Sequence, residues 1–195
     1  QQLNQLMKNP GTGTRGKIGI PMVLNMYELL PFWHAFFTNL GFQVIVSPFS
    51  NRKLYQAGQG SIPSDTVCFP AKLTHGHIMA LLKKDVDAIF YPCMSYNVDE
   101  GLGDNHYNCP VVAYYPEVLA GNIRELEDTK FIYEYLNLEQ RKDFVRLMPK
   151  IMQKYYPDLK TSDIHNAIEV AYTAYRKHME DTRKEAERMM TEARN

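Results

Sequence analysis

The sequence predicts an α/β fold in which helices flank a mainly parallel β-sheet of roughly four or five strands. A helical C-terminal extension, ending in a long helix, is expected to follow. Residues 17–46 have the pattern strand–helix–strand, which is the crossover unit that builds parallel sheets. The first strand, KIGIPMVL at residues 17–24, is apolar on both faces, as expected for a central strand that helices cover.

Each further element follows from its own pattern. In residues 25–40 large apolar side chains recur every three or four residues, which indicates a helix, and Gly41 follows as its C-terminal stop. The short apolar runs at 42–46 (FQVIV) and 86–91 (VDAIFY) indicate strands. The remaining predicted elements are a short helix and loop over 51–62, a helix over 70–84, a polar loop over 95–108 and a last strand over 110–115 (PVVAYY).

Residues 124–195 are expected to be helical, with helices over 138–155 and 161–194. The last helix has apolar positions that alternate threes and fours, but beyond His178 its other positions are Lys, Arg, Glu or Asp. With more than 30 residues it would be about 45 Å long at the usual rise per residue. We therefore expect residues 180–195 to be mobile, or to pack on a neighbouring domain or another chain.

The composition excludes several classes of partner. The 195 residues contain 22 Lys and Arg against 22 Asp and Glu, so no basic field is available to attract nucleic acid or anionic lipid. No apolar run approaches the length of a membrane span, and the N-terminal residues lack the apolar core of a signal peptide. Three widely spaced cysteines do not indicate a secreted disulfide framework. We predict a cytoplasmic protein that binds neither nucleic acid nor membrane.

The three cysteines are the candidate metal ligands. Cys68 directly precedes Phe69-Pro70 at the start of a predicted helix, where free N–H groups favour a thiolate. Cys93 follows a predicted strand, at the sheet edge where ligands bind in open α/β folds. Cys109 opens the last predicted strand, which is the opposite edge unless its loop folds over. The alternative is that all three are ordinary structural thiols, because their spacing lacks the paired C-x2-C of zinc ribbons and ferredoxins.

Polar residues after Cys68 are candidates for acid–base work. Lys72 lies one turn further along the helix and could meet an anionic ligand, although a solvated lysine is the alternative. His75 and His77 are two residues apart and should therefore point to different faces. At most one of them is expected to join a site, with the other on the helix surface. Lys72 and His75 are the catalytic candidates. The remaining aromatic candidates, expected to serve packing, are Tyr91, Tyr96, Tyr114 and Tyr115.

Four long strings of sequence carry a family resemblance. They are IGIPMVLNMYELLPFWHAFFTNLGFQVIVSPFS, IPSDTVCFPAKLTHGHI, DAIFYPCMSYN and NCPVVAYYPEVL. In this order they resemble the core of acyl-CoA dehydratase activase-related proteins, large anaerobic proteins in which parts similar to 2-hydroxyacyl-CoA dehydratases are fused to CoA-substrate-specific enzyme activase modules. The resemblance covers residues 17 to about 123. Residues 124–195 match only in being helical.

The resemblance implies a Rossmann-like, three-layer domain that helps to hold a [4Fe–4S] cluster. Three cysteines would bind the cluster and leave one iron open. By motif, Cys68 in Cys-Phe-Pro-Ala-Lys corresponds to the first ligand and Cys93 in Tyr-Pro-Cys to the second. In the dehydratases the third ligand comes from the following domain. Cys109 in Asn-Cys-Pro is then either a substitute ligand or structural.

The same resemblance implies partners and a division of the chain. An ATP-dependent activase domain injects an electron that reduces the thioester of an acyl-CoA substrate and enables loss of water. We expect residues 17–123 to form the dehydratase-type domain, residues 124–195 a helical extension toward a following dehydratase-like domain, and residues 1–16 a lead-in linker. Such a domain is not expected to be active alone.

Three hypotheses follow for the function. The first is a cluster-bearing domain of an acyl-CoA dehydratase or a related low-potential reductase. The second is a metal-free α/β interaction module that docks an activase or partner domain through the long helix. The third is a small-molecule-binding α/β domain. Cys68 and Cys93 facing one cleft at the sheet edge would favour the first hypothesis, and separated thiols would favour the others.

Overall fold

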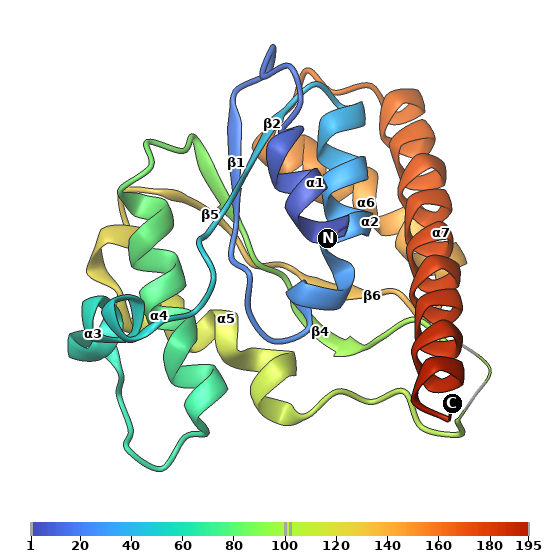
Figure 1. Cartoon of the computed structure of the whole chain (residues 1–195). Coiled ribbons are helices and arrows are strands. Elements are labelled where there is room, and N and C mark those ends of the chain that lie inside the picture. The colour runs from blue at the N-terminus through green and yellow to red at the C-terminus, as the bar shows by residue number, and fades with distance from the viewer. Residues whose placement is uncertain (1, 100, 102, 195) are drawn as a thin grey trace.

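The computed structural model describes residues 2–99, 101 and 103–194. Four parallel strands form the central sheet in the order β2-β1-β3-β5 (Figure 1). Their bounds are Lys17–Ile20 for β1, Gln43–Val46 for β2, Ala88–Phe90 for β3 and Lys130–Ile132 for β5. The predicted parallel sheet is confirmed.

Helices cover both faces of this sheet, which gives the predicted three layers (Figure 1). One layer consists of α1 (Gln2–Lys8), α2 (Met26–Asn39), α6 (Arg141–Tyr155) and α7 (Thr161–Ala193). The opposite layer consists of α3 (Arg52–Gly58), α4 (Phe69–Leu82) and α5 (Pro110–Asn122). Short 3-10 turns, η1 (Gln59–Ser61) and η2 (Arg124–Leu126), follow α3 and α5.

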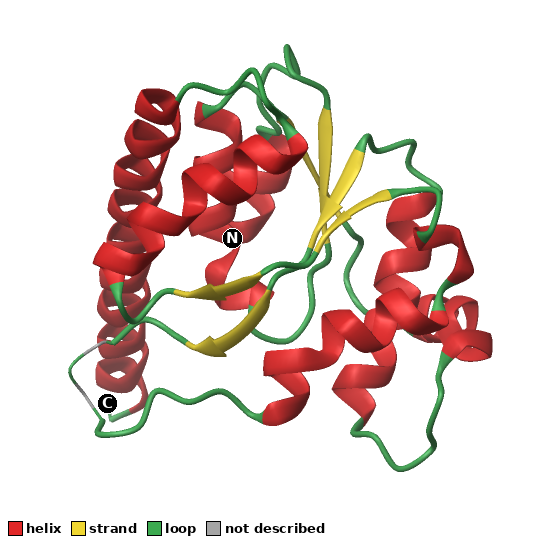
Figure 2. Cartoon of the chain, turned by 180° about the vertical axis from the view of Figure 1, so that it is seen from behind, coloured by secondary structure: helices red, strands yellow, loops and turns green. Residues whose placement is uncertain are grey.

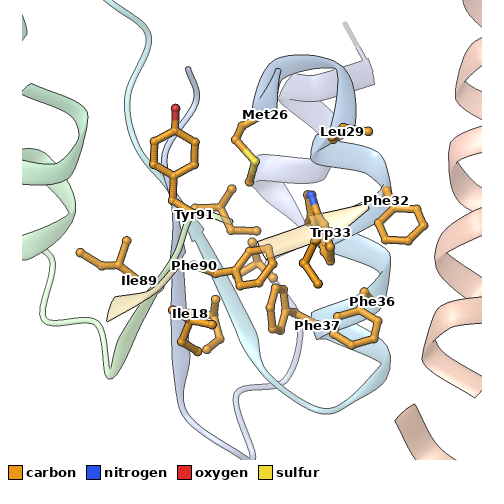
Figure 3. Packing of buried hydrophobic residues seen from close by; sticks show 14 of the residues in the cluster. Ile18, Met26, Leu29, Phe32, Trp33, Phe36, Phe37, Ile89, Phe90 and Tyr91 are labelled. Atoms are coloured by element: carbon orange, nitrogen blue, oxygen red, sulfur yellow. The ribbon is translucent and has the colours of Figure 1, made fainter. Parts of the chain in front are cut away.

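Aromatic side chains of α2 form the centre of the core against the sheet (Figure 3). The ring centroid of Trp33 lies 4.5 Å from that of Phe90 on β3, and Phe37 lies 4.9 Å from the same ring. All three side chains are fully buried. Removing a buried Phe or Trp side chain typically costs about 3–5 kcal/mol, so this contact fixes the position of β3.

A second, two-stranded sheet lies beyond the ends of β3 and β5 (Figure 2). In it β4 (Cys93–Tyr96) pairs in parallel with β6 (Tyr135–Asn137). Because β5 and β6 both fall within residues 124–195, the prediction that this part of the chain is entirely helical is wrong. β5 pairs with β3 and so belongs to the central sheet.

The predicted strand at 110–115 is also wrong, because this segment begins α5. A short apolar run such as PVVAYY fits a buried helix as well as a strand. Pro110 at the start provides the φ angle that a first helical turn needs, and the buried positions Ala113, Pro116 and Leu119 recur at helical spacing. Cys109 therefore precedes a helix, in the same way as Cys68 does.

The N-terminal segment is more than a linker, because it contains a helix that packs on the core. Within residues 1–16, expected to be a linker, α1 packs partly buried apolar side chains on the core: Leu3, Leu6 and Met7.

The first half of α7 packs on α2, and Tyr175 donates a hydrogen bond to Glu28 over 2.8 Å. Of the helices in the described part of the chain, none has the length and apolarity to cross a membrane.

The last half of α7 lies along the surface of the molecule, and ion pairs between its own side chains stabilise it. From residue 180 to residue 194 all side chains except that of Asp181 are exposed. Lys184 pairs with Glu180, and Arg188 pairs with both Glu185 and Glu192. Such i,i+3 and i,i+4 pairs stabilise a helix by about 0.2–0.5 kcal/mol each.

Two glycines bring α3 and α4 into backbone contact. A Cβ atom placed on Gly76 would lie 2.0 Å from the carbonyl oxygen of Leu54, and one on Gly58 would lie 2.2 Å from the backbone nitrogen of Gly76. No side chain fits at either position. This contact fixes the position of α4, which carries Cys68 at one end and His75 in its middle.

We expect Gly76→Ala to lower the free energy of unfolding by about 2–4 kcal/mol, because backbone has to move to accept the methyl group. Gly121→Ala is the matched control, since it is also a helical glycine but has open space around it. It should raise stability by about 0.5–1 kcal/mol through helix propensity. Urea unfolding followed by circular dichroism measures both. Equal effects of the two substitutions would contradict the backbone contact.

Amide protons in residues 180–193 should exchange with solvent faster than those in residues 164–175. The first half of α7 buries six side chains whereas the second half buries none, and most helical stability comes from such packing. Hydrogen exchange measured by mass spectrometry compares the two halves within one helix. Equal protection would show that the second half packs on something in solution.

Candidate functional site

The strand order creates a switch point between β1 and β3. From β1 the chain goes to β2 on one side and then returns to β3 on the other side. Ligands in open α/β sheets bind outside the carboxyl ends of the strands at such a point. The segment Tyr91–Cys93 leaves β3 here, with all three residues buried. We therefore take this edge of the sheet as the candidate site.

Cys68 and Cys109 occupy equivalent positions, as the residues that precede α4 and α5, and both are exposed. Cys93 is buried at the start of β4. Cys68 thus lies at a helix start, as the sequence indicated, whereas Cys93 lies beyond the carboxyl end of β3, as predicted, but also begins a further strand, β4, that was not predicted. Within the described residues, no three His, Cys, Asp or Glu side chains gather into a group that could hold a metal ion.

Cys93 is held as a neutral thiol. Burial raises its pKa to about 12, and the negative charges of Glu117 and Glu134 contribute further to the rise. At neutral pH the sulfur therefore keeps its proton in this environment. A bound metal ion would displace that proton, because a coordinating thiol loses it outright.

Two buried tyrosines, Tyr91 and Tyr115, lie near the cysteines that are the candidate metal ligands. Burial raises the pKa of the Tyr91 hydroxyl, with further contributions from Cys93 and Tyr115. Burial also raises the pKa of Tyr115, with a contribution from Cys68. Tyr91 therefore lies near Cys93 and Tyr115, and Tyr115 lies near Cys68. Sequence patterns predict only packing for both tyrosines, because a contact between residues so far apart in the chain leaves no local signal.

The Tyr91 hydroxyl is the unusual polar group of this region. Its side chain is fully buried, and among the described residues the hydroxyl has no hydrogen-bond partner. Figure 3 shows the ring directed away from the Trp33 and Phe37 rings. Leaving a buried donor unpaired costs about 1–3 kcal/mol. An acceptor bound next to this hydroxyl would remove that cost, as it would for the Trp33 indole N–H, which is also buried without a partner among the described residues.

His75 lies in a directed chain of hydrogen bonds that ends at Tyr115. The Ser61 hydroxyl donates its proton to the Gly58 carbonyl over 3.0 Å, so it can only accept at 2.8 Å from His75 Nδ1–H. His75 Nε2 is then unprotonated and accepts from the Tyr115 hydroxyl at 3.0 Å. Burial lowers the pKa of His75 to about 4, which agrees with this neutral tautomer. His75 thereby orients Tyr115.

His77 is buried as well, so the expectation that one of the two histidines lies on the helix surface is wrong. α3 covers one side of α4 and the sheet covers another, so side chains on two faces of this helix are buried. His77 Nδ1 lies 2.7 Å from Ser47 Oγ, and its Nε2 lies 2.9 Å from Ser50 Oγ. Ser47 Oγ also accepts from the Met22 N–H over 2.7 Å. This network joins α4 to the segments that follow β1 and β2.

Lys72 takes a local role in the described structure. Its ammonium group donates a hydrogen bond over 2.7 Å to the carbonyl oxygen of Asp65, in the loop before α4. The bond closes this loop over the first turn of the helix, next to Cys68. A catalytic role for Lys72 or His75 stays a prediction.

Comparison with known proteins gave one match. A family model described as "CoA enzyme activase uncharacterised domain" matches residues 17–195. The comparison with curated proteins and the comparison with solved structures gave no match.

The buried, neutral His77 should make the chain less stable in mild acid. Burial lowers its pKa to about 4 from an ordinary value of 6.5, so below about pH 6.5 the unfolded chain binds a proton that the folded chain refuses. Stability is then full above pH 6.5 and falls toward pH 4, by on the order of 2–3 kcal/mol for this one group.

The variant His77→Asn should be less stable at pH 7.5 but should lose less stability between pH 7 and pH 4.5. Urea unfolding at a series of pH values measures this slope. His165→Asn is the matched control, because His165 is exposed on α7, and it should keep the slope of the unaltered chain. If His77→Asn lost as much stability between pH 7 and pH 4.5 as the unaltered chain does, His77 would not be the group whose pKa is lowered in the folded chain.

Proposed function

The chain belongs to the CoA enzyme activase uncharacterised domain family, and from this membership we propose that it supplies two thiolates, Cys68 and Cys93, to an iron–sulfur cluster. Membership confirms the resemblance to activase-related proteins that the sequence motifs indicated. The proposed role of the domain is in ATP-driven, low-potential electron transfer to a CoA thioester. Its proposed partners are an ATP-dependent activase domain, a following dehydratase-like domain and an acyl-CoA substrate.

The unpaired hydroxyl of Tyr91 is the observation that carries this proposal. This hydroxyl is buried close to Cys93 and Tyr115, at the edge of the sheet where ligands bind in open α/β folds. Sulfur atoms of a cluster accept hydrogen bonds, and such bonds help to set the reduction potential. A cluster bound by the two cysteines would satisfy the hydroxyl that the protein leaves unpaired.

The residues of this chain fit part of such a site. Three thiolates hold the cluster in the dehydratases that the sequence resembles, whereas no group of three donors gathers within the described residues. We therefore propose that the third ligand comes from the following dehydratase-like domain, with Cys109 as the alternative. When bound, the cluster would supply one-electron chemistry. The chain's own residues exclude water around Cys93 and orient Tyr115 through His75.

The exposed half of α7 supports a second candidate, a metal-free interaction module that docks an activase or partner domain. Met189 and Met190 are both more than half exposed on this segment. Methionine is a flexible apolar side chain that adapts to varied binding surfaces. This candidate becomes the better one if the cysteines take up no iron.

Anaerobic reconstitution of the 195-residue chain with iron and sulfide tests the proposal. We expect Cys68→Ala and Cys93→Ala each to reduce bound iron at least tenfold, because each removes a ligand that the other cannot replace. Cys109→Ala is the matched control, since Cys109 also precedes a helix and is exposed, and it should retain more than half of the iron. Iron counting and electron paramagnetic resonance provide the measurements.

Two outcomes would contradict the ligand assignment. One is that both single variants bind as much iron as the unaltered chain. The other is that the unaltered chain binds no iron even when an added small thiol takes the place of the third ligand. In either case the domain would be better described as the docking module.

A further inference from the structure

Four partly exposed tyrosines form a continuous surface over β4, β6 and the start of α5. We call the four residues and the adjoining carboxylate the tyrosine surface: Tyr96, Tyr107, Tyr114, Tyr135 and Glu117. The exposed fractions of the tyrosines lie between 36% and 48%. Isolated exposed aromatics are common, but a contiguous set of them marks an interaction site.

Direct contacts join the members of the tyrosine surface into a series. The ring centroids of Tyr96 and Tyr107 lie 5.1 Å apart, and the hydroxyls of Tyr107 and Tyr114 lie 3.1 Å apart. The rings of Tyr114 and Tyr135 follow at 6.1 Å. The Tyr135 hydroxyl then donates a hydrogen bond of 2.6 Å to Glu117. The side chains are thus held in place before any partner arrives, which lowers the entropy cost of binding.

The charge of this region is negative. Between Cys93 and Arg124, a range that includes β4, the loop after it and α5, the sequence contains four acidic residues and neither lysine nor arginine. In the described part of the chain, Glu117 and Asp104 form no ion pair. A ligand whose recognition depends on phosphate groups would be repelled here. A cationic partner would be attracted.

Elsewhere in this protein, a tyrosine that lies next to a glutamate has a cationic side chain over its ring. The Arg141 guanidinium lies 4.6 Å from the ring centroid of Tyr172 and also pairs with Glu169. Lys154 lies 5.2 Å from the ring centroid of Tyr155, and both bind Glu134. These are two sets of tyrosine, glutamate and cation.

Tyr135 and Glu117 form the same pair without a cation from the described residues. We propose that the tyrosine surface binds an arginine-bearing segment of a partner protein, with a guanidinium stacked on Tyr135 and paired with Glu117. Arginine fits better than lysine because its planar group stacks on an aromatic ring and binds a carboxylate through two N–H groups. Tyrosine and arginine are also the side chains that dominate the energy of protein interfaces. This proposal does not depend on a cluster at the cysteines.

Calorimetric titration of the metal-free, 195-residue chain at low salt tests it. The probes are acetylated, amidated pentapeptides of sequence Gly-Arg-Gly-Arg-Gly, the same peptide with lysine, and the same peptide with glutamate. We expect the arginine peptide to bind at least fivefold more tightly than the lysine peptide, and the glutamate peptide not to bind. Adding salt should weaken binding, because the carboxylates become screened.

Single substitutions locate the binding site. Tyr135→Ala and Glu117→Gln should each weaken binding of the arginine peptide at least fivefold. Phe49→Ala is the matched control, because Phe49 is an equally exposed aromatic residue, at 47%, outside the tyrosine surface. It should leave the affinity unchanged. All three positions are exposed, and circular dichroism confirms that each variant is folded.

Four results would overturn the proposal. They are equal affinity for the arginine and lysine peptides, no loss of affinity in either site variant, binding of adenosine monophosphate that Tyr135→Ala abolishes, and self-association of the chain that Tyr135→Ala abolishes. The third result would indicate a nucleobase site and the fourth a contact between copies of the chain. Iron uptake plays no part in these measurements, so the cluster proposal and this one fail separately.

Discussion

The contact between Trp33 and Phe90 is the interaction on which the rest of the structure depends. It fixes Phe90 toward α2, and because successive side chains on a strand point to opposite faces, Ile89 must then face the layer of α4 and α5 (Figure 3). Tyr91 follows directly after the end of β3. A shift of β3 by one residue would exchange these faces. Packing on one face of the sheet therefore sets the register of β3, and with it the residue that leaves the strand at the candidate site.

The parts of the fold that sequence patterns predicted are those with local signals. The helix over α2 and the parallel strands beside it follow from residue periodicity within short windows. The run after Cys109 was assigned wrongly because its five apolar residues suit either a strand or a helix. The deciding information, burial at positions 113, 116 and 119, extends beyond the run itself.

The candidate site was predicted less completely than the fold. The positions of Cys68 and Cys93 could be read from the elements beside them, since each lies at the end of one. The roles of Tyr91, Tyr115 and His75 could not, because they arise from contacts between β3, α4 and α5 that only the folded chain creates. Both histidines of α4 are buried because two layers enclose that helix, and a pattern confined to one helix does not show how many sides are covered.

The close approach of Gly58 and Gly76 has a mechanical consequence. With no side chain between the two backbones, α3 and α4 can neither slide nor roll across each other, so they behave as one stiff element. The hydrogen bond from Tyr115 to His75 links this element to α5 close to the glycine contact. A displacement of α5 would then be carried to Cys68 as a movement of the whole helix pair, without bending of α4 itself.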